Sequence, residues 1–444
     1  MNLSGKNINF HDQSTKTNPN RVLILLSLLI AAAFMLQSLN QGKIVSPFAA
    51  TPIPTRSAES FRMEAEAHFY SGNMGKAIDS YQTAIALDPT NVELYAELAR
   101  IQTYSTNLLT TDQEKWDRMQ EALATIDKAV ELDGNSSTAH AIRAFVLDWN
   151  ASLQLAGDQG PIYLAEAFNE SKVATELDNT NTLALAYSAE IQVDEMNLTG
   201  AELNIKQALE QDDTLMDVHR IHALILESQG EYGQAIDAYE RAAQITPNLT
   251  FLYIQIGVNY RQLRQYDTAL EYFAKAANIN EQLEIKDPIP YLAIGKTYSQ
   301  MGEFFAASLN MQKALNFDPV NPDVFASVGI TYFKSRNYEG AIPALKCAIR
   351  GCTAEESCEV RQCDSATDAM LPVQGVALSD TTVVYYYTYG SVLAAMHRDS
   401  NGYCKEAMQV LKEVDDVYAN DPNIHPIVAE SQQICQSYGY AIPR

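Results

Sequence analysis

Six cysteines, all within the last hundred residues of this 444-residue chain, are the residues whose type and spacing best suit chemistry. An even number of thiols outside a reducing compartment favours disulfide bonds, while clustered thiols can also bind zinc. None of the spacings is C-x-x-C, and neither His397 nor His425 follows a finger-like pattern. We therefore expect disulfides and no metal site, formed by Cys347, Cys352, Cys358, Cys363, Cys404 and Cys435.

Signs of catalysis are absent from the sequence. His219 and His222 lie three residues apart, a spacing that suits a metal pair, but both fall on packing positions of a helix. The stretch Gly295-Lys296-Thr297 is similar to the end of a phosphate-binding loop, yet residue 290 is Pro where that loop needs Gly. The G-x-S-x-G and H-E-x-x-H motifs do not occur. We predict no enzymatic activity and no cofactor.

A repeated segment organises the chain instead. Residues 235–247, AIDAYERAAQITP, recur as AIDSYQTAIALDP at residues 77–89. Ala, Tyr and Ala at i, i+4 and i+7 lie on one helical face, and Pro ends the helix. A stripe at 219, 222, 223 and 226 predicts a preceding helix, which Gly230 closes. The unit is a helix-turn-helix of 34 residues.

This unit resembles the tetratricopeptide repeat (TPR) family. The resemblance implies an all-α, right-handed solenoid of about nine repeats over residues 58–421, followed by a capping helix at 422–444. A small residue is expected in each first helix where the two helices of a repeat approach closely. It is found at Ala65, Ala99, Ala144, Ala189, Ala223, Gly257, Gly295, Gly329 and Gly390.

Insertions interrupt the register at three places. Repeats two and three each carry about eleven extra residues between their helices, around 107–119 and 151–162. A Cys-rich insertion occupies residues 351–380 after repeat eight. We expect all three to be loops at the edges of the solenoid, and disulfides to hold the third.

The solenoid geometry predicts the cysteine pairing. Cys404 and Cys435 are expected at the same edge, so we predict a bond between them, and the other four cysteines pair among themselves at the opposite edge. A disulfide needs Cα atoms within about 7 Å. Cys347 to Cys352 is the bond expected least, because five residues along a helix separate Cα atoms by more than that.

The N-terminal region predicts a single-span membrane anchor. Residues 22–39 are an uncharged apolar run of eighteen residues, just long enough to span a bilayer. A polar tail at 1–21 precedes it, and a Pro/Ala/Thr linker at 40–57 follows. The alternative is a secretory signal cleaved after Ala50. Lys6, Lys16 and Arg21 ahead of the run predict a cytoplasmic N-terminus and extracytoplasmic repeats.

The charge of the chain limits its partners. The formal net charge is −24 and the pI is about 4.6. Nucleic acids and anionic lipid surfaces require basic patches. We therefore predict a protein or peptide partner and no nucleic acid.

The resemblance implies that partners bind the concave groove lined by first helices. Chaperone-docking members of the family hold a terminal carboxylate in a Lys/Asn clamp, but the matching positions here are Arg62 and Glu66, and Glu66 would repel that ligand. The predicted groove residues are Arg62, Glu66, Tyr70, Arg100, Tyr104, Phe145, Trp149, Glu190, Asp194, Arg220, Glu227, Arg261, Lys296 and Lys334. We expect Tyr104 and Trp149 to be its central anchors.

Two functions fit this sequence. The first is a membrane-anchored extracytoplasmic scaffold that binds proteins in its groove during assembly of an envelope, secretion or surface complex. The second is a non-catalytic accessory subunit of an envelope polysaccharide or peptidoglycan enzyme, acting through the inserted loops. The sequence leaves the partner's identity and the oligomeric state open.

Overall fold

The computed structural model describes residues 18–40, 56–109, 111–153, 156–364 and 366–443. Within these ranges the regular structure is helical, apart from one isolated β-bridge. The chain divides into two compact units, Met1–Arg56 and Ser57–Arg444. The fold is therefore all-α, as the sequence periodicity predicts.

The first unit contains helix α1 (Pro19–Asn40). Its segment Pro19–Ser38 is 0% buried and is long and apolar enough, by length and composition, to cross a membrane. Among the described residues it is the one helix with that property. Most of the predicted tail (1–21) and linker (40–57) lies outside the described residues.

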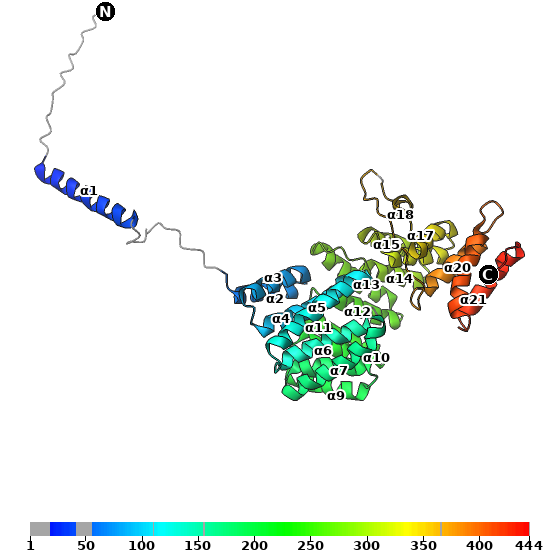
Figure 1. Ribbon diagram of the computed structural model, residues 1–444, viewed down its shortest axis with the longest axis horizontal. Coiled ribbons are helices and arrows are strands. Elements are labelled where there is room, and N and C mark those ends of the chain that lie inside the picture. The colour runs from blue at the N-terminus through cyan, green and yellow to red at the C-terminus, as the bar shows by residue number, and fades with distance from the viewer. Residues whose placement is uncertain (1–17, 41–55, 110, 154–155, 365, 444) are drawn as a thin grey trace, which may run out of the picture. The chain divides into compact units, whose positions relative to one another are not determined.

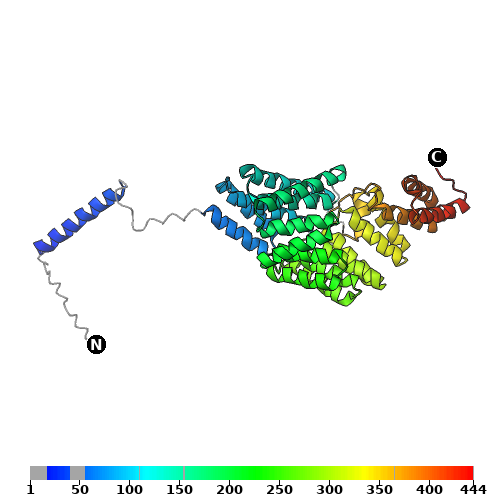
Figure 2. The same ribbon diagram turned by 90° about the horizontal axis from the view of Figure 1, so that it is seen from below.

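The second unit begins with nine pairs of packed helices, which confirms the predicted number of repeats (Figures 1 and 2). The pairs are α2 (Ala58–Tyr70) with α3 (Met74–Leu87), α4 (Val92–Ser105) with α5 (Asp112–Leu132), α6 (Ser137–Ser152) with α7 (Gly160–Leu177), α8 (Thr182–Asp194) with α9 (Leu198–Gln211), α10 (Met216–Ser228) with α11 (Tyr232–Ile245), α12 (Thr250–Gln262) with α13 (Tyr266–Gln282), α14 (Ile289–Met301) with α15 (Phe304–Phe317), α16 (Pro322–Lys334) with α17 (Tyr338–Arg350), and α19 (Val383–Ala395) with α20 (Tyr403–Tyr418).

Close approach within each pair explains the small residue of the first helix. A Cβ atom at Gly257 would lie 2.5 Å from the ring of Phe273, and one at Gly329 would lie 2.6 Å from Leu345. Each of these partners comes sixteen residues later, on the second helix of the same repeat. A larger residue at either glycine would push the helices apart, so this position sets the interhelix distance.

The first two insertions are only partly loops, because they also lengthen the helices that follow, which corrects our expectation. The second helices α3, α9 and α11 have 14 residues each, whereas α5 has 21 and α7 has 18. Thr111 and Glu114 start α5 with a capping box, and Pro161 lies in the first turn of α7. These local start signals stabilise the extra helical turns.

The first six repeats close on themselves. A Cβ atom at Gly72, in the turn of repeat one, would lie 2.3 Å from the carbonyl oxygen of Asn248, just before repeat six. The ring of Tyr104 on α4 stacks on Phe251 of α12, with 5.5 Å between ring centroids. The inner face of these repeats is therefore largely interior.

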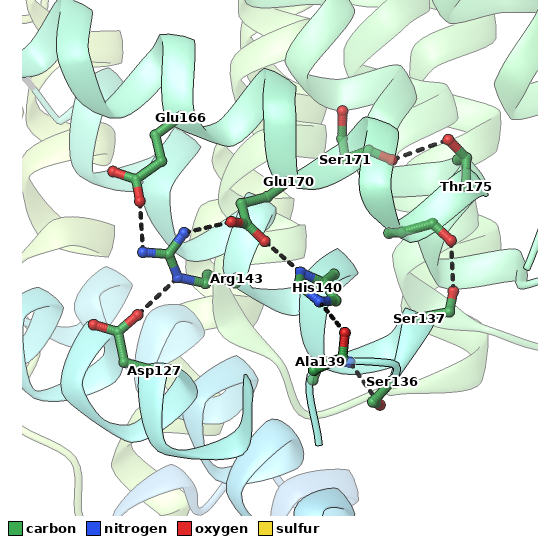
Figure 3. A network of polar contacts seen from close by, with 12 residues as sticks. Asp127, Ser136, Ser137, Ala139, His140, Arg143, Glu166, Glu170, Ser171 and Thr175 are labelled. Atoms are coloured by element: carbon green, nitrogen blue, oxygen red, sulfur yellow. Dashed lines mark hydrogen bonds and ion pairs between the residues drawn. The ribbon is translucent and has the colours of Figure 1, made fainter. Parts of the chain in front are cut away.

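A polar network fixes α6 between its neighbours (Figure 3). The guanidinium of Arg143 on α6 donates to Asp127 of α5 at 2.7 Å and to Glu166 and Glu170 of α7 at 2.6 and 2.8 Å. Glu170 also contacts His140 Nδ1 at 2.5 Å. Arg143 contacts three carboxylates, and Glu170 contacts both Arg143 and His140. These shared contacts hold repeats two and three rigidly together.

The C-terminal part adds a helix to the Cys-rich insertion and a final helix to the solenoid. The insertion contains α18 (Ala354–Arg361), so it is only partly a loop. Helix α21 (Ile424–Ser437) packs on α19 and α20 at the position predicted for the cap. A second hydrophobic cluster, separate from that of the first six repeats, extends over these elements.

All six cysteines are paired. The predicted bond between Cys404 and Cys435 is confirmed, and it ties α20 to α21 with 5.3 Å between the Cα atoms. The other bonds are Cys347–Cys352 and Cys358–Cys363.

The bond between Cys347 and Cys352, which we expected least, therefore exists. Its Cα atoms are 4.7 Å apart because α17 ends at Arg350 and Gly351, at φ 73°, turns the chain back. Cys352 then forms an antiparallel β-bridge with Val373. The expectation was wrong because it extended the helix through this glycine.

Candidate functional site

The predicted groove residues all lie on first helices, but the structure divides them into two groups. Those of repeats two to five mostly bond to one another, while those of repeats six to eight surround an open pocket. The set is carried by α2 (Arg62, Glu66, Tyr70), α4 (Arg100, Tyr104), α6 (Phe145, Trp149), α8 (Glu190, Asp194), α10 (Arg220, Glu227), α12 (Arg261), α14 (Lys296) and α16 (Lys334).

Asp217 is the centre of the first group. Its carboxylate accepts hydrogen bonds from the hydroxyls of Tyr104 and Tyr187, the latter at 2.7 Å, and pairs with Arg100 at 3.0 Å. Burial alone would raise the pKa of Asp217, but Arg100, Arg220 and the two hydroxyls hold it below its ordinary value. The aspartate is therefore a charged structural link between repeats two, four and five.

Arg220 forms a second link beside Asp217. Its guanidinium donates two hydrogen bonds to Glu190, at 2.7 and 2.6 Å, and one from Nε to the hydroxyl of Tyr104 at 3.1 Å. It also lies 5.6 Å from the ring centroid of Phe145 and 5.7 Å from that of Trp149. Because both charges are buried and paired, this group has little capacity left for a partner.

Tyr104 is a core residue, contrary to our expectation that it anchors a partner. Its side chain is 0% exposed, and Phe145 is 1% exposed and stacks on Tyr187 with 4.5 Å between ring centroids. The reason is the closure of the superhelix, which packs α12 over α4. Trp149 is half-buried and lines a small cavity of the inner face.

The groove residues predicted on α2 are either paired with each other or exposed on the surface. Arg62 forms ion pairs with Glu66 on the next turn and with Glu59 at 2.6 Å. Tyr70 is 53% exposed. An internal salt bridge thus occupies the positions of the carboxylate clamp, Arg62 and Glu66, where the sequence already argued against binding of a terminal carboxylate.

The second group defines what we call the basic pocket, a cavity of about 280 Å³. Arg261, Lys296 and Lys334 line it together with neutral residues and no carboxylate. Among the described residues, no salt bridge joins any of these three cations to an acid, and Arg261 Nη1 is buried without a hydrogen-bond partner. Three cations thus converge on open space in a chain of net charge −24.

The environment of the basic pocket disfavours the charged forms of Arg261 and Lys296, although Asp323 attracts Lys296. Burial lowers the pKa of Arg261, and burial together with the neighbouring Arg261 lowers that of Lys296. Both shifts mean that the protein environment opposes the positive charge. A bound anion would relieve this cost, so the arrangement is suited to a carboxylate or another anionic group.

Sequence reasoning missed three residues that shape the inner face. Asp217 and Phe251 each lie six positions before the close-approach residue of their repeat, and this shared register was available as a signal. Asp148 lies four positions after its close-approach residue, as Glu227 and Arg261 do. The register rule that selected those two residues selects Asp148 as well.

Three stretches of the chain match the tetratricopeptide repeat family, at residues 65–102, 221–249 and 252–283. Among solved structures, the human IFIT1 dimer with PPP-AAAA has a similar fold, with a TM-score of 0.52 and 18% identity over 88% of this chain and 92% of that chain. The chain therefore contains tetratricopeptide repeats, and repeats of this family form scaffolds for protein–protein interaction.

Curated relatives match only part of the chain. BBSome complex member BBS4 from Bos taurus is 26% identical over 116 residues, covering 26% of this chain and 21% of BBS4. Anaphase-promoting complex subunit 3 from Schizosaccharomyces pombe is 24% identical over 114 residues, covering 26% of this chain and 16% of that protein. The chain thus spans about a fifth of these relatives, which by name belong to multiprotein complexes.

Proposed function

We propose that this protein is a membrane-anchored, extracytoplasmic scaffold that binds a protein partner on the inner face of repeats six to eight. In this role it assists assembly of an envelope, secretion or surface complex. Helix α1 supports the anchor, because it is apolar and long enough to span a bilayer. Three disulfides support the extracytoplasmic side, because such bonds persist in oxidising compartments.

The observation that carries the proposal is the basic pocket. Cations that form no salt bridge within the described part of the chain are an electrostatic match for acidic side chains of a partner. The inner face of the earlier repeats has no comparable set, because Arg100 and Arg220 are already paired with Asp217 and Glu190. The C-terminal repeats are therefore the part of the groove that we assign to the partner.

The choice of a protein partner follows from the overall charge. The similar human IFIT1 structure contains PPP-AAAA. For this chain we propose a protein partner because a net charge of −24 repels extended polyanions, whereas a local basic pocket can still receive one or two acidic side chains. The partial relatives BBS4 and anaphase-promoting complex subunit 3 are complex members, which agrees with this choice.

A second candidate, an accessory subunit of an envelope polysaccharide or peptidoglycan enzyme, is favoured by one observation. The Cys-rich insertion is held by its two disulfides and by an ion pair of 2.6 Å between Lys346 and Glu356. A cavity of about 480 Å³ lies beside it, lined by residues of α17, α18 and the turn before α20. A rigid insertion of this kind offers a surface separate from the groove.

Affinity purification separates the two candidates. The full-length protein is purified from its native membranes as the wild type, as the double variant Lys296→Glu/Lys334→Glu, and as the control Lys172→Glu/Lys206→Glu on the exposed sides of α7 and α9. Both doubles change the net charge equally. We expect the control to retain the co-purifying partner and the pocket variant to lose it. Retention by both variants would contradict binding at the basic pocket.

A further inference from the structure

A different cavity, of about 270 Å³, lies among α6, α8, α10 and α12 on the inner face of repeats three to six. We call it the acidic pocket. Three carboxyl groups line it, those of Asp148, Glu190 and Asp194, with Arg220 as the one basic residue of its lining. Aromatic side chains, including Trp149, form part of its wall.

The charges in the acidic pocket do not balance. Arg220 forms its ion pair with Glu190, through two hydrogen bonds, and Glu190 also accepts the indole N–H of Trp149 at 3.1 Å. Within the described residues, no salt bridge joins Asp148 or Asp194 to a cation. Asp194 accepts one hydrogen bond from the Ser152 hydroxyl at 2.6 Å, which is a neutral donor.

Asp148 is a second, independent observation that points to a ligand site. Its side chain is 1% exposed, and within the described residues Oδ1 has no hydrogen-bond partner. A buried polar atom of this kind costs about 1 to 3 kcal/mol if it stays unpaired. Other buried carboxyls of the inner face, such as Asp217 and Glu190, are fully paired.

We propose that the acidic pocket binds a primary ammonium group, as carried by a lysine side chain. The ammonium has three donors, which suit the free oxygens of Asp148 and Asp194, and the ring of Trp149 provides a cation–π contact. The assignment of this lysine to the protein partner rests on the function proposed above. The binding of an ammonium group in the pocket is independent of that function.

Proton linkage follows from the surroundings of Asp148. Burial, and then repulsion by Glu190 and Asp194 of α8, raise its pKa well above the ordinary value, while Arg220 of α10 opposes this. Tyr239 of α11 also lines the pocket, and α12 adds no charged group. The raised pKa favours the protonated carboxyl of Asp148. Binding of an ammonium displaces this proton to solvent, so affinity rises with pH.

The two tryptophans of the chain allow a direct test. In a Trp116→Phe variant of the full-length protein, Trp149 is the sole tryptophan, and its emission reports on the pocket. The ligands are Nα-acetyl-lysine amide and the uncharged, similarly sized Nα-acetyl-norleucine amide, titrated at pH 6, 7 and 8. We expect a saturable change with the lysine ligand alone, with affinity increasing from pH 6 to pH 8.

Asp148→Asn is the decisive variant, since it keeps the size of the side chain but removes the ionisable group. It should weaken lysine binding by about ten- to a hundredfold and abolish the pH dependence. Asp323→Asn, at a half-buried acid outside the acidic pocket, should leave binding unchanged, and so should Lys296→Glu in the basic pocket.

An equal response to the norleucine ligand, or unchanged binding in Asp148→Asn, would overturn the assignment. A lysine response combined with partner binding that is insensitive to Lys296→Glu/Lys334→Glu would instead refute the proposed function alone. Circular dichroism of each variant shows that it is folded.

Discussion

Tyr104 on α4 donates a hydrogen bond from its hydroxyl to the carboxylate of Asp217 on α10, which joins the second repeat directly to the fifth. The same carboxylate receives Tyr187 of the fourth repeat. In an open solenoid each repeat contacts only its neighbours. Here the inner face is bridged, so the stability of the first six repeats depends on contacts across the superhelix.

The bridge predicts that Tyr104 is required for stability. Tyr104→Ala should destabilise the protein by about 3 to 5 kcal/mol, since it removes a buried aromatic ring. Tyr104→Phe should cost about 1 to 3 kcal/mol, because Asp217 and Arg220 each lose a partner. Thermal and urea unfolding measure both effects.

The matched control is Tyr70→Ala, at the same register position of repeat one, where the side chain is 53% exposed. It should change stability by less than about 0.5 kcal/mol. Equal effects of Tyr70→Ala and Tyr104→Ala would show that the inner face is not closed at Tyr104.

The contrast between local and distant contacts explains what the sequence could predict. Gly257 and Phe273 are sixteen residues apart within one repeat, so periodicity alone places them together. Tyr104 and Asp217 are 113 residues apart, and their meeting depends on the pitch of the superhelix. Small rotations at each repeat set that pitch, and residue spacing does not encode them. The groove residues could therefore be named, but not their burial.

The Cys-rich insertion shows a different limit. The even number of cysteines and their sequence spacing predicted disulfides. The expected positions of Cys404 and Cys435 at one edge of the solenoid predicted their bond. Cys347–Cys352 depended on one backbone angle at Gly351, which turns the chain immediately after α17. Glycine after a helix is a known stop signal, and giving it more weight would have allowed this bond.

Opening the Cys404–Cys435 bond should release the final helix. Both side chains are fully buried between α20 and α21, so Cys404→Ser/Cys435→Ser leaves two hydroxyls in an apolar site. We expect faster amide hydrogen exchange in α21 and in neighbouring parts of α19 and α20, with repeats one to six unchanged. Exchange measured by mass spectrometry checks this. Unchanged protection of α21 would mean that the bond does not hold it.

Asp287 predicts a pH-dependent effect on stability. This carboxyl accepts hydrogen bonds from Ile289 N–H and Asn280 Nδ2, both at 2.8 Å, and burial raises its pKa to about 6. The folded state therefore holds the proton more tightly than the unfolded state. The stabilising contribution is complete below about pH 4 and is lost as the pH rises through 6.

Asp287→Asn removes this loss of stability at high pH, because an amide does not ionise. The new amide can also donate to Asn280 Oδ1, a buried atom that has no partner among the described residues. We expect a gain of up to about 3 kcal/mol at pH 7.5, shrinking toward pH 4. Melting curves across this range test it. A gain that is independent of pH would rule out titration of Asp287 as the cause.

The membrane topology is open to protease accessibility. We predict a cytoplasmic N-terminus because Lys6, Lys16 and Arg21 precede α1, whereas only Lys43 and Arg56 follow before the first repeat. Protease added to intact cells, or to sealed right-side-out vesicles, should digest the repeats. A cytoplasmic marker protein must remain intact in the same sample. Complete protection of the repeats would reverse the proposed orientation.

Photo-cross-linking in intact cells tests most directly the claim that a protein partner occupies the inner face of repeats six to eight. A photoreactive phenylalanine replaces Ile330 in the basic pocket or, as a control, Leu203 on α9, which is 67% exposed. We predict a discrete protein adduct from position 330 that disappears when Lys296→Glu/Lys334→Glu is combined with it, and no such adduct from position 203. An adduct at 203 with none at 330 would contradict the proposal.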